Sequence, residues 1–188
     1  MSTITAPPVS IVFGEEHGDV LIRDERERLH AIMWEPPEDK IPRCRCCDRK
    51  VRGYRRALNS GMARSLVWLA RWSRMQPGEY VHVPTQAPRF VLRSREFDKL
   101  EHWALIVRKE NEDETKRESG EWAITERGVS FVNHKLIVPS HVLMYNNEVL
   151  GTDGETDIVM SLGEHFNYQA LMSAHNITDE DKKPRKKK

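Results

Sequence analysis

Several features of secreted and membrane proteins are missing from this sequence of 188 residues. It has only three cysteines, all between Cys44 and Cys47, which excludes a disulfide framework of the secreted type. No apolar run approaches the roughly 18 residues that a membrane-spanning helix needs. Residues 1–10 contain neither a basic residue nor a long apolar stretch, so no signal peptide is visible. We therefore expect a protein of the reducing cytoplasm, with no membrane segment.

The sequence signatures of common enzyme classes are missing as well. The chain has no phosphate-binding loop of the Gly-x-x-x-x-Gly-Lys type and no dinucleotide fingerprint. Neither His-Glu-x-x-His nor Gly-x-Ser-x-Gly occurs. Asp153, Glu155 and Asp157 lie close together in sequence, but such surface clusters are usually solvated rather than metal-binding. We predict that the protein is not an enzyme.

What the sequence does contain is a modest apolar fraction and a segregated charge. Apolar residues make up 38% of the chain, below the usual ~45–50%, which indicates a small core. The net charge is only +1, yet residues 43–75 carry ten basic residues and one acidic residue. Residues 1–42 and 140–178 each have a net charge of −5, and residues 179–188 have +3. Basic segments in the middle and at the end indicate a surface that faces a polyanion.

Prolines, glycines and charge runs divide the chain into four parts. Residues 1–43 form an N-terminal extension with small strands and a short helix. Residues 44–150 form the main domain, and residues 151–178 form an acidic helical segment. Residues 179–188 are a basic tail that cannot bury apolar surface, so we expect it to be disordered.

A helix predicted over residues 54–75 is the clearest element of the main domain. Four apolar residues recur with helical spacing and share one face: Leu58, Met62, Leu66 and Leu69. Arg64 and Arg71 lie two turns apart on another side, where they could face a phosphate backbone. Pro77-Gly78 ends the helix.

Shorter elements in the order of a helix-turn-helix follow this helix. They are a strand over 80–83, a helix over 85–92, a break at residue 93, a helix from 94 to about 105, strands over 105–109 and 122–124 around a polar loop, and a helix capped by residue 125. In the second short helix, Phe97, Leu100 and Ala104 occupy the buried face, with Ser94 as its N-cap. Residues 135–150 then form a β-hairpin with Asn146-Asn147 at its turn.

Two motifs bracket the polar loop of this region. Trp103-Ala104-Leu105-Ile106 precedes the loop, and Trp122-Ala123-Ile124-Thr125-Glu126-Arg127-Gly128 follows it. Together they resemble the winged helix-turn-helix of multiple-antibiotic-resistance-type regulators, in which a Leu-Thr-x-x-Gly turn ends the β-wing. The resemblance covers about residues 54–134. It departs from the family pattern at Ala104, where glycine is common, in the acidic wing, and in the absence of a long C-terminal dimerisation helix.

A longer stretch is similar to uncharacterised zinc-associated winged-helix proteins of bacteriophages and mobile elements. It shares with them a Cys-x-x-Cys before an arginine-rich helix, the run Leu92-Arg93-Ser94-Arg95-Glu96, and Tyr145-Asn146-Asn147. This resemblance implies a phage or mobile-element origin. The protein of a phage gene would act in the cytoplasm of the host.

The cysteines predict a metal site. Cys44-Arg45-Cys46-Cys47 contains the Cys-x-x-Cys spacing that lets two thiolates approach one tetrahedral zinc ion. We predict a structural Zn²⁺ held by Cys44 and Cys47 in a short knuckle, with Cys46 or a histidine completing the shell. Because no second Cys-x-x-Cys is present, the alternative is a set of free thiols.

The predicted fold class is therefore α+β: a winged helix-turn-helix core, a short Cys-rich knuckle before it, and a C-terminal β-hairpin plus short helices. We predict binding of double-stranded DNA, as a transcriptional regulator and as a monomer or homodimer. The expected DNA contacts are Arg93, Ser94, Arg95, Lys99 and His102 in the second short helix, Lys116 and Arg117 in the wing, and Arg52, Arg55 and Arg56. The alternative is a protein-binding winged helix, a host-takeover or anti-defence factor whose acidic stretches 110–121 and 148–164 meet a basic host protein.

Overall fold

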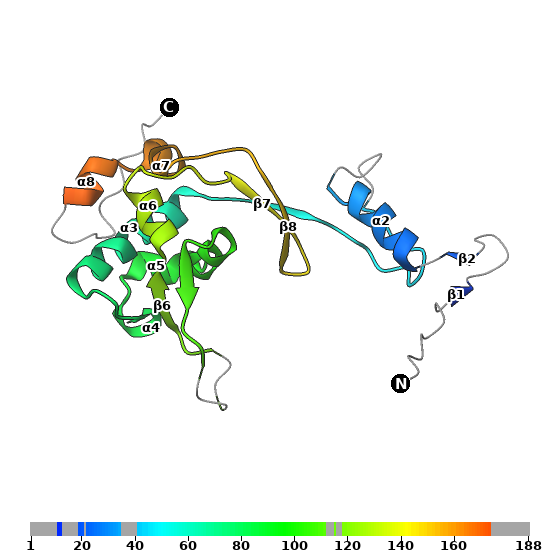
Figure 1. Cartoon of the computed structure of the whole chain (residues 1–188), viewed down its shortest axis with the longest axis horizontal. Helices are drawn as coiled ribbons and strands as arrows, with labels where there is room; N and C mark the ends of the chain where they lie inside the picture. The colour runs from blue at the N-terminus through cyan, green and yellow to red at the C-terminus, as the bar shows by residue number, and fades with distance from the viewer. Residues whose placement is uncertain are drawn as a thin grey trace, which may run out of the picture. The chain divides into compact units, whose positions relative to one another are not determined.

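The computed structural model describes residues 11–12, 19–20, 22–34, 41–111, 115 and 118–173 (Figure 1). Helices and small antiparallel sheets make up this part of the chain, so the predicted α+β class is confirmed. None of the helices in these ranges has the length and apolarity needed to cross a membrane. The predicted disorder of residues 179–188 concerns a segment outside the described residues.

Two compact units divide the chain. The smaller unit comprises Met1–Arg55 and Leu143–Leu150, and the larger comprises Arg56–Val142 and Gly151–Lys188. This division differs from the four parts expected from the sequence. The cysteines fall in the smaller unit together with the N-terminal extension, and the acidic C-terminal segment belongs to the larger unit.

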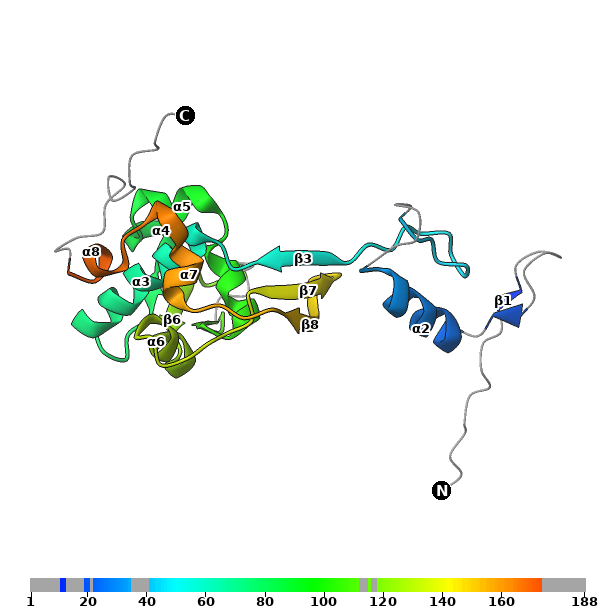
Figure 2. The ribbon, with the colours of Figure 1, turned by 90° about the horizontal axis from the view of Figure 1, so that it is seen from above.

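Helix α3 (Ser60–Met75) forms the centre of the larger unit. Met62, Leu66 and Leu69 are buried on it, as their spacing predicted. The predicted start at residue 54 is wrong, because the Asn59 side chain caps the helix by accepting the Met62 N–H at 3.0 Å. Tyr54–Ala57 is strand β3 instead. Figures 1 and 2 show α3 in contact with α5 (Arg89–Ser94), α6 (Glu126–Val132) and α7 (Ile158–Leu162).

A three-stranded antiparallel sheet packs beside α3. Its strands are β4 (Val81–His82), β5 (Ile106–Arg108) and β6 (Glu121–Ile124), in the order β4-β6-β5. Val81 pairs with Trp122, and Ile106 pairs with Ile124. The predicted pairing of the strands on either side of the polar loop is therefore confirmed.

The helices between β4 and β5 differ from the prediction. α4 (Val83–Gln86) and α5 replace one helix over 85–92, because Pro88 lacks an N–H and stands at the N-cap of α5. The next helix, η2 (Phe97–Trp103), is a 3₁₀ helix that begins three residues later than predicted. The reason is Arg95, whose left-handed φ of 50° ends α5 and separates the two helices. Ser94 is thus the last residue of α5, and not the N-cap of the next helix.

The predicted β-hairpin is confirmed in β7 (His141–Tyr145) and β8 (Glu148–Asp153), which are neighbours in the sheet β3-β7-β8. Asn146 and Asn147 adopt φ values of 50° and 65°, the left-handed pair that a type I′ turn requires. Beyond the hairpin lie α7, η3 (Gly163–His165) and α8 (Tyr168–Ser173). Near the N-terminus, β1 (Ile11–Val12) pairs with β2 (Asp19–Val20), and α2 (Ile22–Ile32) follows.

Thr125 and Gly128 fix the start of α6 against the end of η2. The Thr125 N–H donates to the Leu105 carbonyl at 3.1 Å, and its hydroxyl donates to the Ala104 carbonyl at 2.7 Å. The same hydroxyl accepts the Gly128 N–H at 3.0 Å and caps α6. A Cβ on Gly128 would collide with the Leu105 carbonyl oxygen. The Thr-x-x-Gly pattern therefore has a local steric cause.

We predict that Gly128→Ala lowers the free energy of unfolding by about 1–3 kcal/mol, because the added methyl must displace backbone. Urea denaturation followed by circular dichroism measures the change. Gly61→Ala is the matched control. Its Cβ would meet only the Asn59 side chain, at 3.2 Å, and a helical alanine is favoured over glycine. Equal losses in both variants would contradict the steric explanation.

Ala104 gives a second prediction, because it adopts a left-handed φ of 55° at the end of η2. This conformation is strained for alanine and free for glycine. Ala104→Gly should therefore leave the protein as stable or raise its stability by up to about 1 kcal/mol. Ala123→Gly, in regular strand β6, should instead cost about 0.5–1 kcal/mol. Thermal and urea denaturation of the two variants distinguish these outcomes.

Candidate functional site

Three exposed arginines lie around the turn between α5 and η2. Arg89 and Arg93 are four residues apart on α5 and so share one helix face, and Arg95 occupies the left-handed turn. We call these residues the arginine trio. None of them forms an ion pair with any residue that the structure describes. Ser94 supports the turn, since its hydroxyl donates to the Val91 carbonyl at 2.8 Å and accepts the Glu96 N–H at 3.4 Å.

The predicted recognition helix η2 carries no excess of positive charge, since it contains Asp98 and Glu101 beside Lys99. Lys99 pairs with Asp98 at 2.7 Å. Burial lowers the pKa of His102, and the nearby Lys99 and Arg56 lower it further, so this ring is neutral at pH 7. Arg95 lies before η2 rather than on the same helix face as Lys99 and His102. The arrangement expected for reading bases from one helix is therefore not present.

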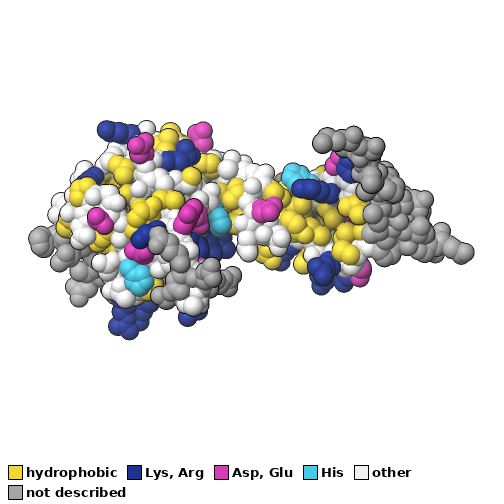
Figure 3. All heavy atoms as spheres, turned by 60° about the horizontal axis from the view of Figure 1, so that its bottom comes forward, with side chains coloured by type: hydrophobic (Ala, Val, Ile, Leu, Met, Phe, Trp, Pro, Cys, Tyr) yellow, Lys and Arg dark blue, Asp and Glu magenta, His cyan; other side chains and the backbone are white. Residues whose placement is uncertain are grey.

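The other predicted DNA contacts lie on elements other than α5 and η2. Arg56 pairs with Glu96 at 3.4 Å, and Arg52 lies 5.9 Å from the centre of the Tyr54 ring. Arg52 and the exposed Arg55 belong to the smaller unit, whereas Arg56 belongs to the larger. Lys116 and Arg117 lie outside the described residues. On the face shown in Figure 3, basic side chains are interspersed with acidic and hydrophobic ones.

Of the three arginines of α3, Arg64 is buried, Arg71 is half-buried and Arg74 is exposed. The Arg64 guanidinium is 1% exposed and lies 3.7 Å from the Phe90 ring centre and 5.0 Å from that of Phe166. Arg71 donates to the Leu171 carbonyl at 2.6 Å. The hypothesis that Arg64 faces a phosphate backbone is wrong, because its side chain is covered by α5 and the C-terminal segment, whereas for the half-buried Arg71 it stays a prediction. Arg89, which the sequence reasoning did not select, is exposed; its spacing from Arg93 was the available signal.

The three cysteines occupy the turn of a tight hairpin formed by residues 42–51, here called the cysteine hairpin. Arg43 and Lys50 form an antiparallel bridge, and the Val51 N–H donates to the Pro42 carbonyl at 2.8 Å. The Cys44 N–H donates to the Arg49 carbonyl at 2.9 Å, and the Cys44 carbonyl accepts the Asp48 N–H at 2.7 Å. Asp48 reverses the chain with a left-handed φ of 55°.

A buried carboxylate fastens the cysteine hairpin to α2. Glu25 is 2% exposed, and its Oε1 accepts the Arg45 N–H at 2.7 Å. Arg28 Nε donates to the other carboxylate oxygen at 2.8 Å, and Arg28 Nη2 donates to the Arg43 carbonyl at 2.8 Å. The hydrogen bond from Arg28 is the main cause that lowers the pKa of Glu25, against the opposing effect of burial. The Glu25 carboxylate is therefore ionised at neutral pH, and it is held by hydrogen bonds from both Arg28 and Arg45.

The sulfur atoms gather around Cys44, which packs against the small core of Leu29, Met33 and Val51. Burial disfavours the Cys44 thiolate. Hydrogen bonds from the N–H groups of Cys46 and Cys47, and from the Cys47 thiol, outweigh burial, so the pKa of Cys44 is lowered. Burial raises the pKa of Cys46, and the adjacent Cys44 sulfur adds to this effect. The environment therefore shifts the pKa values of these two thiols in opposite directions.

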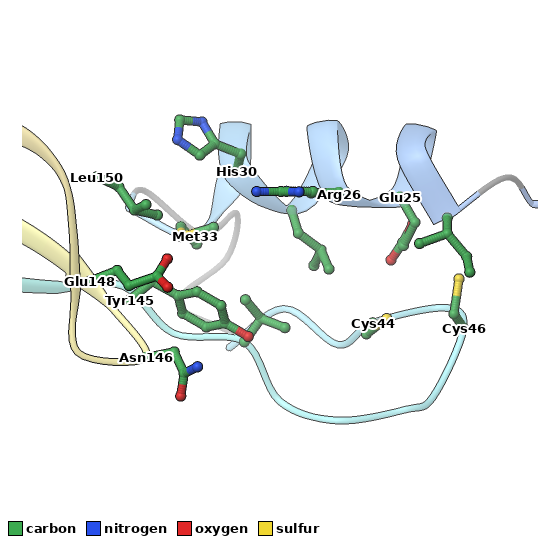
Figure 4. A pocket seen from close by; sticks show the side chains of 13 residues that line it. Glu25, Arg26, His30, Met33, Cys44, Cys46, Tyr145, Asn146, Glu148 and Leu150 are labelled. Atoms are coloured by element: carbon green, nitrogen blue, oxygen red, sulfur yellow. The ribbon is translucent and has the colours of Figure 1, made fainter.

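A cavity of about 350 Å³ lies between α2, the cysteine hairpin and the β7–β8 turn (Figure 4). Cys44 and Cys46 line it together with Met33 and Tyr145. Figure 4 shows His30 at the other end of the cavity from Cys46. Among the described residues there is no group of three or more His, Cys, Asp or Glu side chains able to hold a metal ion. The predicted zinc site at Cys44 and Cys47 therefore stays a prediction.

The Glu25 anchor leads to a pH-dependent prediction. Because the folded-state pKa is lowered, the anchor contributes its full stability above the ordinary pKa of a glutamate and is lost as the pH falls through the lowered value. Glu25→Gln should remove that dependence and speed hydrogen exchange of the Arg45 amide by about 10–150-fold, corresponding to ~1.5–3 kcal/mol for a charge-assisted hydrogen bond. Glu27→Gln, on an exposed position of α2, is the control and should change neither quantity.

Comparisons with known proteins assign no family or function to the chain. No model of a known protein family matches the chain, and neither the curated proteins nor the solved structures contain a match.

Proposed function

We propose that the larger unit is a winged helix-turn-helix that binds double-stranded DNA, and that the protein is a transcriptional regulator of phage or mobile-element origin. The arrangement of elements supports this fold. The elements α3, β4, α4, α5, η2, β5 and β6 follow each other in chain order, and β6 lies between β4 and β5 in the sheet. In a winged helix the hairpin β5–β6 is the wing, and α5 and η2 are the helix-turn-helix.

The observation that carries the DNA proposal is the arginine trio. An exposed guanidinium without an acidic partner keeps its full charge for phosphate, and it need not break an existing ion pair to bind. Lys99 and Arg56 would have to give up Asp98 and Glu96. We therefore assign the main phosphate contacts to Arg89, Arg93 and Arg95, and not to η2.

The charge balance of η2 favours a second candidate, a protein-binding winged helix. Asp98, Glu96 and Glu101 flank the positions that would enter the major groove, and carboxylates repel phosphate. Glu101 pairs with Arg108 at 3.6 Å, so part of this acidic charge is already neutralised. The partner expected under this second candidate function is a host protein with a basic surface.

A salt titration of duplex binding tests the DNA proposal. We expect the logarithm of the affinity to fall with the logarithm of salt concentration, with a slope of about −0.9 per neutralised phosphate. Replacing the trio by alanine (Arg89→Ala, Arg93→Ala and Arg95→Ala together) should flatten the slope by up to about 2.7, whereas the triple lysine variant should keep most of it. Fluorescence anisotropy with a labelled duplex measures both.

Two controls make this test specific. Lys99→Ala should change the slope by much less than Arg95→Ala, because Asp98 already neutralises Lys99. A charge-matched triple variant of Arg23, Arg26 and Lys135, which are exposed elsewhere, reports the effect of net charge alone. If the two triple variants changed the salt dependence equally, the arginine trio would not be part of the DNA interface. Failure of the intact chain to bind any duplex at low salt would contradict the DNA proposal and leave the protein-binding candidate.

A further inference from the structure

The cavity of the smaller unit has the size and the apolar wall of a small-molecule site. Its volume of about 350 Å³ lies within the range of such sites, which begins at about 300 Å³. All thirteen side chains that line it belong to the smaller unit. Ile22 and Leu29 share one face of α2, and Val51 and Leu150 line the cavity from the cysteine hairpin and from β8. An apolar molecule bound here would shield these side chains from water, which favours its binding.

Sulfur atoms and an aromatic ring make part of this wall polarisable. Met33, Cys44 and Cys46 contribute three sulfur atoms, and Tyr145 contributes its ring from the end of β7 (Figure 4). Thioether sulfur makes favourable contacts with aromatic rings, and aromatic rings also pack against each other. The apolar body that fits this lining best is therefore an aromatic one.

The same cavity is lined by one cation and one anion that are available to a ligand. Arg26 on α2 and Glu148 on β8 come from different walls, and neither forms an ion pair within the described part of the chain (Figure 4). The other carboxylate in the lining, Glu25, already accepts hydrogen bonds from Arg28 and Arg45. The charges that the cavity offers to a ligand are therefore those of Arg26 and Glu148.

We propose that this cavity binds a small zwitterion with an aromatic body, which is the chemistry of a free aromatic amino acid. Arg26 pairs with its carboxylate and Glu148 with its ammonium group, while the body lies against the apolar and sulfur-bearing side chains. A ligand with a single charge would shield the second charged side chain from water without compensating it, which costs binding free energy. The site lies in the smaller unit and does not depend on DNA binding by the larger one.

Isothermal titration calorimetry of the full-length, reduced protein tests this assignment with L-phenylalanine and three matched probes. Phenylpropionate keeps the ring and the carboxylate, phenethylamine keeps the ring and the ammonium group, and L-alanine keeps both charges without the ring. We expect saturable binding of L-phenylalanine at one site. Phenylpropionate and phenethylamine should each bind about fivefold more weakly or worse, because each lacks one ion pair. L-Alanine should give no measurable binding at the same concentrations.

Charge-removing variants assign the two contacts. Arg26→Gln should weaken the binding of L-phenylalanine and phenylpropionate and leave that of phenethylamine unchanged, whereas Glu148→Gln should weaken L-phenylalanine and phenethylamine only. Glu27→Gln, at an exposed position of α2 that does not line the cavity, is the control and should change none of the affinities.

A cavity-filling variant keeps the test independent of the charges. Ile22 is 51% exposed, so Ile22→Trp should fill the cavity and abolish binding without lowering the melting temperature. The proposal would be overturned by the absence of saturable L-phenylalanine binding, or by equal affinities for L-phenylalanine and its two singly charged analogues. Affinities that neither Arg26→Gln nor Glu148→Gln changes, or binding that persists in Ile22→Trp, would overturn it as well.

Discussion

The buried guanidinium of Arg64 is the interaction on which the larger unit depends. The Arg64 side chain projects from the middle of α3. Its guanidinium carbon lies 3.7 Å from the ring centre of Phe90 in α5 and 5.0 Å from that of Phe166 in the C-terminal segment. Cation–π contacts gain strength when they are removed from water, and a 1% exposed arginine is fully removed. This contact fixes α5 against α3. The arginine trio lies on α5 and on the turn that ends it. The position of this candidate DNA surface therefore depends on Arg64, which is itself buried.

A second constraint acts at the end of η2, where the chain must turn into β5. Ala104 makes the turn in a left-handed conformation, and its carbonyl and that of Leu105 both accept hydrogen bonds from Thr125. Gly128 then allows α6 to approach the Leu105 carbonyl. The Thr-x-x-Gly motif thus joins the end of the β5–β6 hairpin to the end of η2, through contacts such as that between Thr125 and Ala104, which are 21 residues apart.

A feature could be predicted from the sequence where a local pattern marks it. Two apolar stretches on either side of a polar loop predict the β5–β6 pairing, and two asparagines between strands predict the Asn146-Asn147 turn; both were predicted correctly. The start of η2 was not, because it is set by the left-handed conformation of Arg95, which an arginine rarely adopts. The burial of Arg64 was missed because it depends on a contact distant in sequence, since Phe166 follows Arg64 by about half the chain. At the cysteine hairpin, the Cys-x-x-Cys spacing was visible, but the anchoring of Arg45 by Glu25 had no signal in the sequence.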